Sequence, residues 1–320
     1  MTYTLIVARG VLTDVEVETE HLSGRPAQAR LATLATPDDV ERETADADAV
    51  VVTIEPLPRE SIDRFGPRVR IIARAGIGLD AIDLEAAREN GIAVFHTPDY
   101  ATEEVATHAV ALILALNRKL LEGNTIAREA WRDWARMKPV KPLSEQTVGV
   151  VGLGRIGRAV ADRLRPSVGR IVGFDPYVTG TVEGMDIASS LDELLGVTDV
   201  LTLHAPLTDE TRGLIGVREL ALLRPGAIVV NVARGALIDQ PALAAALAEG
   251  RLGGAGLDVL ESEPPAPDDP ILSAPNVILS PHFAWHSEAS DRRMREMSVD
   301  AVLDYLDGRD VTVGRLAVRP

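Results

Sequence analysis

Cysteine is absent from this chain of 320 residues. The absence excludes disulfide bonds, thiolate zinc sites and a cysteine nucleophile. It is also compatible with the cytoplasm, which is the location we expect. Lysine is almost absent, because Lys119, Lys138 and Lys141 are the only ones. There is no Gly-Lys-Ser/Thr phosphate-binding loop, and so few lysines make Schiff-base chemistry a poor fit.

Long hydrophobic runs and an excess of positive charge are missing as well. The longest apolar stretch, about Val105–Leu116, is interrupted by Thr107 and His108 and is too short to span a bilayer. The first residues lack a basic leader followed by a long apolar run, so we expect no signal peptide. The formal net charge of -15 argues against nucleic-acid and membrane partners. A few arginines can still form a local pocket for a small anion.

The length and the order of the apolar segments predict an α/β protein with two domains. A chain of 320 residues exceeds the usual size of one domain, and 46% hydrophobic with 25% charged residues is ordinary for a globular protein. Before Thr102, short β-rich runs alternate with helical stretches, which is typical of parallel sheets. The strands expected there are Tyr3–Ala8, Ala49–Ile54, Arg70–Gly76 and Ile92–Thr97.

The middle of the chain is expected to lead into the second domain. The apolar run that starts at Thr102 predicts a buried helix, with Thr102 as its N-cap. The polar, tryptophan-containing stretch Glu122–Pro142 is expected to be either an arm that packs on a partner subunit or a solvated loop.

A second α/β series begins at Thr147. Within it, Ser190 followed by Glu193 predicts a capping box at the start of a helix. The amphipathic segment Glu288–Leu306 is expected to be a helix that returns to the first domain. The strands expected in this series are Thr147–Val151, Arg170–Asp175, Asp199–Pro206, Ala227–Gly235, Gly254–Glu261 and Asn276–His282, which is the layout of a dinucleotide-binding domain.

A Gly-x-Gly-x-x-Gly motif directly follows the first strand of this series. Gly152 allows a tight turn, Gly154 lets the backbone approach a pyrophosphate, and Gly157 lets the next helix pack closely on the strand. Asp175 ends the following strand at about the ~20-residue distance expected for a residue that binds the ribose hydroxyls. A carboxylate there disfavours a 2′-phosphate, so the motif predicts NAD rather than NADP. A methyltransferase or a purely structural turn is the alternative.

Three ionisable residues stand just after strands of the same series, namely Arg234, Glu263 and His282. Ligands of open α/β sheets bind beyond the carboxyl ends of the strands, so these side chains are expected at one rim together with the glycine turn. Taken alone, Arg234 is better explained as a partner in a surface ion pair, Glu263 as a solvated loop residue, and His282 as a packed histidine. The coincidence of all three at one rim favours a site.

The chemistry of these residue types fits the reduction of a 2-keto acid. Arginine offers a permanent cationic fork for a carboxylate and a keto oxygen. Histidine can give a proton near neutral pH, and a neighbouring glutamate favours the charged imidazolium. No metal is required. His282 and His286 are four residues apart, but no third ligand is apparent, so we expect no metal site.

Five motifs in this order resemble those of the D-isomer-specific 2-hydroxyacid dehydrogenases. They are ARAGIGLDAID (Ala73–Asp83), GLGRIG (Gly152–Gly157), NVARG (Asn231–Gly235), LDVLESEP (Leu257–Pro264) and SPH (Ser280–His282). The resemblance implies two Rossmann-like domains with parallel sheets and an active site in the cleft between them. It implies a discontinuous substrate domain of residues 1–101 and 287–320, an NAD-binding domain of residues 102–286, and a homodimer formed through the latter.

The same resemblance implies a role for individual residues. Arg234 is implied to bind and polarise the substrate, His282 to be the acid/base and Glu263 to be its carboxylate partner. The backbone amides of Gly76, Ile77 and Gly78 are implied to hold the substrate carboxylate. The residues implied to contact or line the cofactor are Thr107, Gly152, Gly154, Arg155, Ile156, Gly157, Asp175, His204, Ala205, Pro206, Val232, Ala233, Asp258 and His282.

Within the family, two segments resemble the branch of phosphoglycerate-dehydrogenase-like proteins and the C-terminal-binding-protein corepressors. They are Pro98–Leu116 and PHFAWHSE (Pro281–Glu288). Trp285 is expected either to line the pocket for the substrate side chain or to be a packing residue. Two functions remain open: an NAD(H)-dependent 2-hydroxyacid dehydrogenase, or an NAD(H)-sensing corepressor-like protein with little catalysis. We expect no regulatory extension after the last helix, and the sequence does not identify the 2-hydroxy acid.

Overall fold

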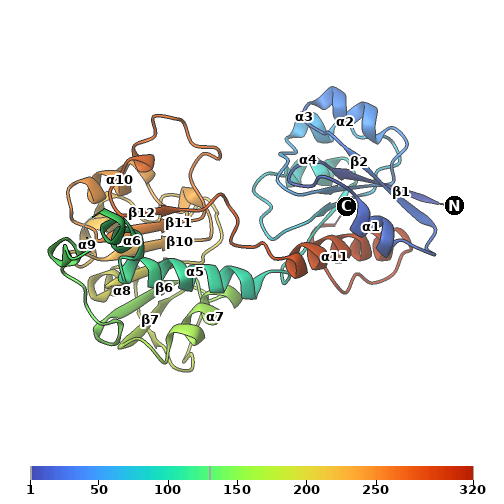
Figure 1. The fold of residues 1–320 in the computed structure, drawn as a ribbon. Helices are drawn as coiled ribbons and strands as arrows, with labels where there is room; N and C mark the ends of the chain where they lie inside the picture. The colour runs from blue at the N-terminus through green and yellow to red at the C-terminus, as the bar shows by residue number, and fades with distance from the viewer. Residues whose placement is uncertain (1, 130, 320) are drawn as a thin grey trace. The chain divides into compact units, whose positions relative to one another are not determined.

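The computed structural model describes residues 2–129 and 131–319, and it divides into two compact units. Unit 1 contains Met1–Ala101 and His286–Pro320, and unit 2 is the continuous stretch Thr102–Trp285. The chain therefore leaves unit 1 once and returns to it once, and both termini belong to unit 1 (Figure 1). No described helix is long and apolar enough to cross a membrane.

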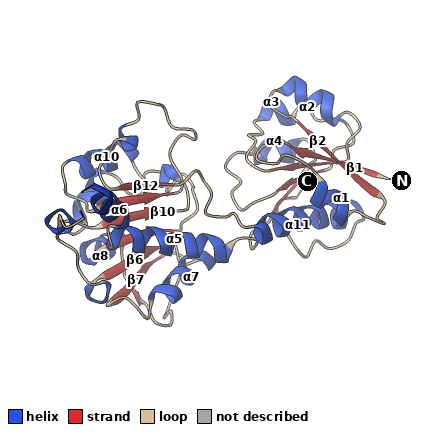
Figure 2. Ribbon diagram, in the orientation of Figure 1, coloured by secondary structure: helices blue, strands red, loops and turns tan. Residues whose placement is uncertain are grey.

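Unit 1 is built on a six-stranded sheet in the order β13-β5-β4-β3-β1-β2. All four expected strands are present, as β1 (Tyr3–Ala8), β3 (Ala49–Val52), β4 (Ile71–Arg74) and β5 (Ala93–His96). These strands and β2 (Ala27–Ala32) run parallel, whereas β13 (Arg315–Val318) pairs antiparallel with β5. The strands β1, β3, β4 and β5 are nearly continuous apolar runs because helices cover both faces of the sheet. Figure 2 shows this layering.

The helices of unit 1 connect successive parallel strands, except the last. They are α1 (Glu16–His21), α2 (Pro37–Thr44), α3 (Arg59–Ile62), α4 (Leu84–Glu89) and α11 (Glu288–Leu306). The helix expected from the sequence at Glu288–Leu306 is confirmed with the same bounds. It begins at the capping residue Ser287 and packs on β3, β4 and α1, so the end of the chain completes a domain that the start of the chain began.

Unit 2 is built on a seven-stranded parallel sheet in the order β12-β11-β10-β9-β6-β7-β8. Six of these strands were expected, and β8 was not, since only two residues form it. The chain order reverses between β6 and β9, which is the switch point where doubly wound sheets bind nucleotides. The bounds are β6 Thr147–Val151, β7 Arg170–Phe174, β8 Asp186–Ile187, β9 Val200–Leu203, β10 Ile228–Asn231, β11 Gly254–Leu257 and β12 Val277–Leu279.

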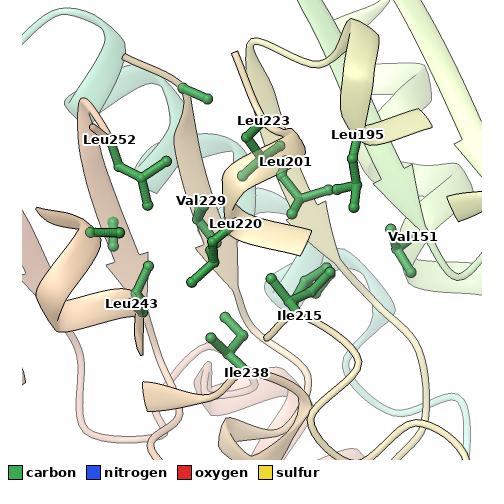
Figure 3. Packing of buried hydrophobic residues seen from close by; sticks show 14 of the residues in the cluster. Val151, Leu195, Leu201, Ile215, Leu220, Leu223, Val229, Ile238, Leu243 and Leu252 are labelled. Carbon is green, nitrogen blue, oxygen red and sulfur yellow. The ribbon is translucent and has the colours of Figure 1, made fainter. Parts of the chain in front are cut away.

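Buried aliphatic side chains hold the strands of unit 2 in place. Figure 3 shows Leu201 of β9 and Val229 of β10 packed among leucines and isoleucines from the surrounding helices and loops. Both side chains are fully buried. The carboxyl ends of these strands are therefore a rigid platform. The helices of unit 2 are α5 (Thr102–Asn117), α6 (Leu120–Glu129), α7 (Arg155–Leu164), α8 (Leu191–Val197), α9 (Val217–Leu222) and α10 (Gln240–Ala248).

Two local expectations about helices are wrong in part. The helix α5 begins at Thr102 itself, so Thr102 is not its N-cap, and Leu114 is 39% exposed because α5 packs on α7, β10 and β11 with one side only. At α8 the Ser190 hydroxyl does accept from the Glu193 amide. The Glu193 carboxylate, however, accepts from the amide of Ser189 instead of closing the capping box on Ser190. The stretch from Glu122 to Pro142 contains most of α6 and a 3-10 helix, Trp134–Met137.

A buried ion pair within unit 1 joins α1 to α11. Arg295 donates Nε to Glu18 Oε1 at 2.8 Å and Nη2 to Glu18 Oε2 at 2.5 Å, and the Glu18 carboxylate is 1% exposed. We predict that Glu18→Ala lowers the free energy of unfolding by about 3–5 kcal/mol, because it leaves a buried guanidinium without its main partner. Urea unfolding measures this loss. The matched control is Arg292→Ala, which breaks an exposed pair with Glu20 and is expected to cost less than about 1 kcal/mol. Equal losses in the two variants would contradict the prediction.

Candidate active site

The glycine turn between β6 and α7 has three different steric requirements. Gly152 has a φ of 88°, and a Cβ there would lie 2.6 Å from the amide nitrogen of Ala205. A Cβ on Gly157 would lie 2.1 Å from the Gly152 carbonyl oxygen, so this glycine sets how closely α7 packs on the turn. A Cβ on Gly154 would meet no described atom within 4 Å. Space is thus left open beside the first turn of α7.

That open space suits an anion such as a dinucleotide pyrophosphate. Gly154 is the N-cap of α7 and supplies no capping side chain, and the amides of the first turn, which ends where the Arg158 amide bonds the Gly154 carbonyl, have no acceptor within the helix. Such amides and the helix dipole attract negative charge. The residues present therefore fit the phosphate groups of NAD.

Asp175, at the end of β7, lies against the same turn. Its Oδ2 accepts from the amide of Leu153 at 2.9 Å, and its Oδ1 accepts from the amide of Tyr177 at 3.0 Å. A carboxylate oxygen has two lone pairs, so each oxygen can still accept one more hydrogen bond. The geometry fits an acceptor for ribose hydroxyls that is held in place by the glycine turn itself.

His204 follows β9 at the other side of the switch point. Its amide donates to Val151 of β6, and its Nε2 lies 2.9 Å from the Thr202 hydroxyl. Burial lowers the pKa of His204 to about 3, so the imidazole is neutral. Its Nδ1 is buried and has no hydrogen-bond partner in the part of the chain that the structure describes. His204 therefore shapes the end of β9 without carrying charge.

The turn after β10 carries Arg234, and the buried side chain of Asn231 folds it. The Asn231 Oδ1 accepts from the amide of Ala233 at 3.0 Å, and its Nδ2 donates to the carbonyl oxygen of Arg234 at 2.8 Å. The next residue, Gly235, backs onto the loop after β11, because a Cβ there would lie 1.9 Å from the carbonyl carbon of Leu260. Arg234 is thus held beside the segment that leads to Glu263.

The loop after β12 carries His282, and the buried carboxylate of Asp258 folds it. Asp258 Oδ1 accepts from the Ser280 hydroxyl at 2.5 Å and from the Phe283 amide at 2.9 Å, and Oδ2 accepts from the Ala284 amide at 2.9 Å. The His282 amide donates to the Asp258 carbonyl oxygen at 2.8 Å. The loop Ser280–Ala284 is therefore wrapped around one acidic residue at the end of β11.

This wrapping holds His282 in an unfavourable backbone conformation. Its φ of 54° lies in the left-handed region, which costs a residue with a side chain about 1–2 kcal/mol. The hydrogen bonds to Asp258 offset that cost. The imidazole of His282 is fixed in turn by Glu263, whose Oε2 lies 2.7 Å from His282 Nδ1.

The charge state of Glu263 is set by competing effects. Burial alone raises its pKa, but the hydrogen bond and the charge of His282, the amide of Leu260 and the positive charge of Arg234 together lower it below the usual value. Glu263 is therefore ionised throughout the neutral range. Arg234 acts on Glu263 electrostatically, so the three ionisable residues expected at the rim influence one another.

In unit 1, the loop after β4 contains Gly76, Ile77 and Gly78. The Gly76 amide already donates to the Thr97 hydroxyl at 2.8 Å, and Gly76 itself has a φ of 142° with the Arg74 guanidinium packed against it. The amides of Ile77 and Gly78 donate to no acceptor within residues 2–129 and 131–319. Of the three amides expected to bind a carboxylate, these two are available.

The other expected site residues lie on the same elements of unit 2. Thr107 is exposed on α5, the helix that packs on α7. Val232 and Ala233 belong to the turn after β10, whereas Ala205 and Pro206 follow His204. Trp285 is half-buried at the end of unit 2. Their contacts with substrate or cofactor remain predictions.

Residues 110–284 match the family described as D-isomer specific 2-hydroxyacid dehydrogenase, NAD binding domain. The chain belongs to the D-isomer specific 2-hydroxyacid dehydrogenase family. The matched residues all lie in unit 2.

Relatives of known name agree with this membership. The chain is 39% identical over 270 residues to the glyoxylate reductase of Korarchaeum cryptofilum, which covers 82% of this chain and 81% of that protein. It is 36% identical over 284 residues to the D-3-phosphoglycerate dehydrogenase of Methanocaldococcus jannaschii, which covers 88% of this chain but only 54% of that protein. The chain thus spans about half the length of the curated D-3-phosphoglycerate dehydrogenases that it matches.

A solved structure supports both the fold and the cofactor. The D-lactate dehydrogenase of Aquifex aeolicus, solved with NAD and lactic acid, aligns with a TM-score of 0.84 and 30% identity over 95% of this chain and 96% of that one. The α/β class with two Rossmann-like units, the family and NAD as cofactor, all expected from the sequence, are confirmed.

The buried residues Asn231 and Asp258 were not expected to organise the loops of the rim. Asn231 was part of a family motif without a role of its own, and Asp258 was expected only beside the cofactor. A usable signal did exist in the sequence. Each is a polar residue at the carboxyl end of a buried apolar strand and three or more residues before an ionisable one, and a buried polar side chain must find hydrogen-bond partners close to it in the fold.

We predict that Gly157→Ala weakens NADH binding. The added methyl group would lie 2.1 Å from the Gly152 carbonyl, so α7 or the turn has to move and the first helical amides lose their alignment. The dissociation constant, measured by NADH fluorescence, is expected to rise by about tenfold or more, which equals about 1.4 kcal/mol. The matched control is Gly196→Ala in α8, where a Cβ meets no described atom within 4 Å. Unchanged NADH affinity in Gly157→Ala would refute the steric argument.

Proposed function

We propose that the protein is an NAD(H)-dependent oxidoreductase that interconverts a 2-keto acid and a D-2-hydroxy acid. The observation that carries the proposal is the His282–Glu263 pair, held at 2.7 Å beside Arg234 at the carboxyl ends of the strands that form the NAD-binding domain. We assign unit 1 as the substrate domain and unit 2 as the cofactor domain.

The residues of the rim have distinct parts in this reaction. NADH supplies the hydride for the keto carbon when it is bound. Arg234 offers a permanent cation for the substrate carboxylate and the keto oxygen. His282 gives a proton from Nε2 to the oxygen that becomes the hydroxyl, while its Nδ1 stays bonded to Glu263. In unit 1, the amides of Ile77 and Gly78 are the donors assigned to the carboxylate.

Glu263 orients the imidazole and stabilises its positive charge. Because the pKa of Glu263 is lowered, its carboxylate is present before, during and after proton transfer at neutral pH. The same arrangement serves both directions, since a protonated His282 is the acid for reduction and a neutral His282 is the base for oxidation. Binding of NAD rather than NADP is supported by the carboxylate of Asp175.

We predict that His282→Ala lowers kcat for 2-keto acid reduction by about 10²–10⁴-fold, because the proton donor is lost. NADH affinity is expected to change little. For the wild-type protein, a general acid in reduction that serves as general base in oxidation predicts that reduction slows toward alkaline pH, whereas oxidation slows toward acidic pH. Steady-state turnover of glyoxylate, hydroxypyruvate, pyruvate and longer 2-keto acids, measured between pH 5 and 10, tests this.

Two results would reject the assignment. One is full activity of His282→Ala. The other is tight NADH binding by the wild-type protein with no turnover of any 2-keto acid, which would favour the corepressor-like alternative. The relatives named above are dehydrogenases and reductases, and their names give that alternative no support.

We also propose that the protein is a cytoplasmic homodimer without nucleic-acid or membrane partners. The absence of cysteine and the net charge of -15 support the location and the lack of such partners. Support for association through unit 2 comes from exposed apolar side chains on α5, α6 and the segment after it. Leu120 is 57% exposed, Leu121 is 54% exposed and Trp131 is 72% exposed.

We predict that Leu121→Glu combined with Trp131→Glu converts the dimer to a monomer, because charges would be buried at an apolar interface. Sedimentation velocity of the wild type and of the double variant measures the state. The control is Tyr177→Glu, which changes an exposed aromatic residue elsewhere on unit 2. A wild-type monomer, or a double variant that stays dimeric, would disprove the assignment of this surface.

A further inference from the structure

A second histidine, His108, contacts the loop that carries His282. His108 of α5 places Nε2 at 2.8 Å from the Ser280 hydroxyl oxygen and at 3.7 Å from Asp258 Oδ1. Ser280 Oγ in turn lies 2.5 Å from the same carboxylate oxygen. The contacts form a chain from a helix, through a hydroxyl, to the buried carboxylate around which the loop Ser280–Ala284 is wrapped.

Counting protons fixes the direction of these hydrogen bonds. The Ser280 hydroxyl has a single proton, and the carboxylate of Asp258, which can only accept, takes it. The contact between His108 and Ser280 therefore needs a proton on His108 Nε2, donated to the Ser280 oxygen. The structure thus requires one particular state of His108, in which Nε2 is protonated.

The order of the groups also shows what this cluster does not do. In a hydrolytic triad the carboxylate binds the histidine, and the histidine accepts the proton of the serine. Here the carboxylate binds the serine, and the histidine donates to it, so Ser280 is not activated as a nucleophile. Since the Ser280 hydroxyl both donates and accepts a hydrogen bond here, its function is to position the groups that it joins.

We propose that His108, Ser280 and Asp258 form a hydrogen-bonded relay that positions the acid/base histidine. The inference rests on the role proposed for His282. Asp258 holds the amides of Phe283 and Ala284 and so keeps His282 in its left-handed conformation. Ser280 closes the near side of the loop on the same carboxylate, and His108 anchors Ser280 to α5.

The anchor matters because α5 is itself firmly packed in unit 2. It lies on α7, β10 and β11, and its residues Ala109, Leu112 and Ile113 are buried. Asp258 alone fixes the loop to the end of one strand. The hydrogen bond from His108 to Ser280 attaches the loop to a second element, α5. With the loop attached at both places, the position and the direction of the imidazole of His282 are determined. His108 and Ser280 are therefore positioning residues.

Kinetics with conservative and disruptive variants test the relay. We expect Ser280→Ala and His108→Ala to lower kcat by about tenfold to 10²-fold through misplacement of His282, with NADH affinity retained. Ser280→Thr keeps the hydroxyl, and His108→Gln keeps an N–H donor at similar reach, so both are expected to stay within about threefold of the wild-type kcat. The matched control is Ser167→Ala, which removes an exposed hydroxyl after α7. Wild-type kcat in both alanine variants, or losses in Thr and Gln equal to those in alanine, would overturn the proposal.

Nuclear magnetic resonance separates the relay from the proposed reaction. In ¹⁵N-labelled protein, His108 is expected to carry its proton on Nε2, and the proton between His282 and Glu263 is expected as a resolved low-field signal. Ser280→Ala should broaden that low-field signal, whereas Ser280→Thr should preserve it. A His108 proton on Nδ1 alone, or a low-field signal unchanged in Ser280→Ala, would contradict the relay. A protein that reduces no 2-keto acid but shows these signals would contradict only the proposed function.

Discussion

The buried carboxylate of Asp258 is the constraint on which the geometry of the rim depends. It is 2% exposed at the end of β11, and a charge in such a place is stable only when hydrogen-bond donors surround it. The donors come from Ser280, Phe283 and Ala284 of the loop that follows β12. The need to satisfy one charge thus dictates the path of the backbone, and that path determines where an imidazole is presented.

A similar solution occurs one strand away. Asn231, 1% exposed at the end of β10, bonds both ends of the turn that leads to Arg234. Asn231 folds the turn that directly follows β10, whereas Asp258, at the end of the neighbouring strand β11, folds the loop that follows β12. Since the strands are held in register by the sheet, the two loops are held relative to each other without any direct bond between Arg234 and His282 being required. Because the strands are rigid, they fix the positions of loops that would otherwise be mobile.

Local sequence patterns were sufficient to predict most helices and strands and the types of residue at the rim. The apolar runs that became β1, β3, β4, β5 and most strands of unit 2 were recognisable because both faces of a parallel sheet are covered. β2 was not recognisable because it is an edge strand whose residues alternate in exposure and which therefore contains no continuous apolar run. β8 was not recognisable because it has only two residues. β13 was missed because its pairing with β5 joins residues that are far apart in the chain.

The bonding pattern of the site was harder to predict than its members. Arg234, Glu263 and His282 could be chosen from their places after strands, and their order resembled a family. That the Gly76 amide is taken by Thr97, or that His108 reaches Ser280, depends on how side chains pack across elements. Such contacts follow from tertiary structure and leave no trace in the spacing of a single sequence.

The discontinuity of unit 1 has a consequence for how the protein is made. The strands β1 to β5 leave the ribosome early, but α11, which covers β3 and β4, and β13, which pairs with β5, emerge only after the whole of unit 2. At about 5–20 residues per second, synthesis of the intervening stretch takes about 10–40 s. During that interval β3 and β4 lack the helix α11, and β5 lacks its antiparallel partner. Unit 2, which is continuous, can finish folding first, so the sheet of unit 1 stays incomplete until α11 and β13 have been synthesised.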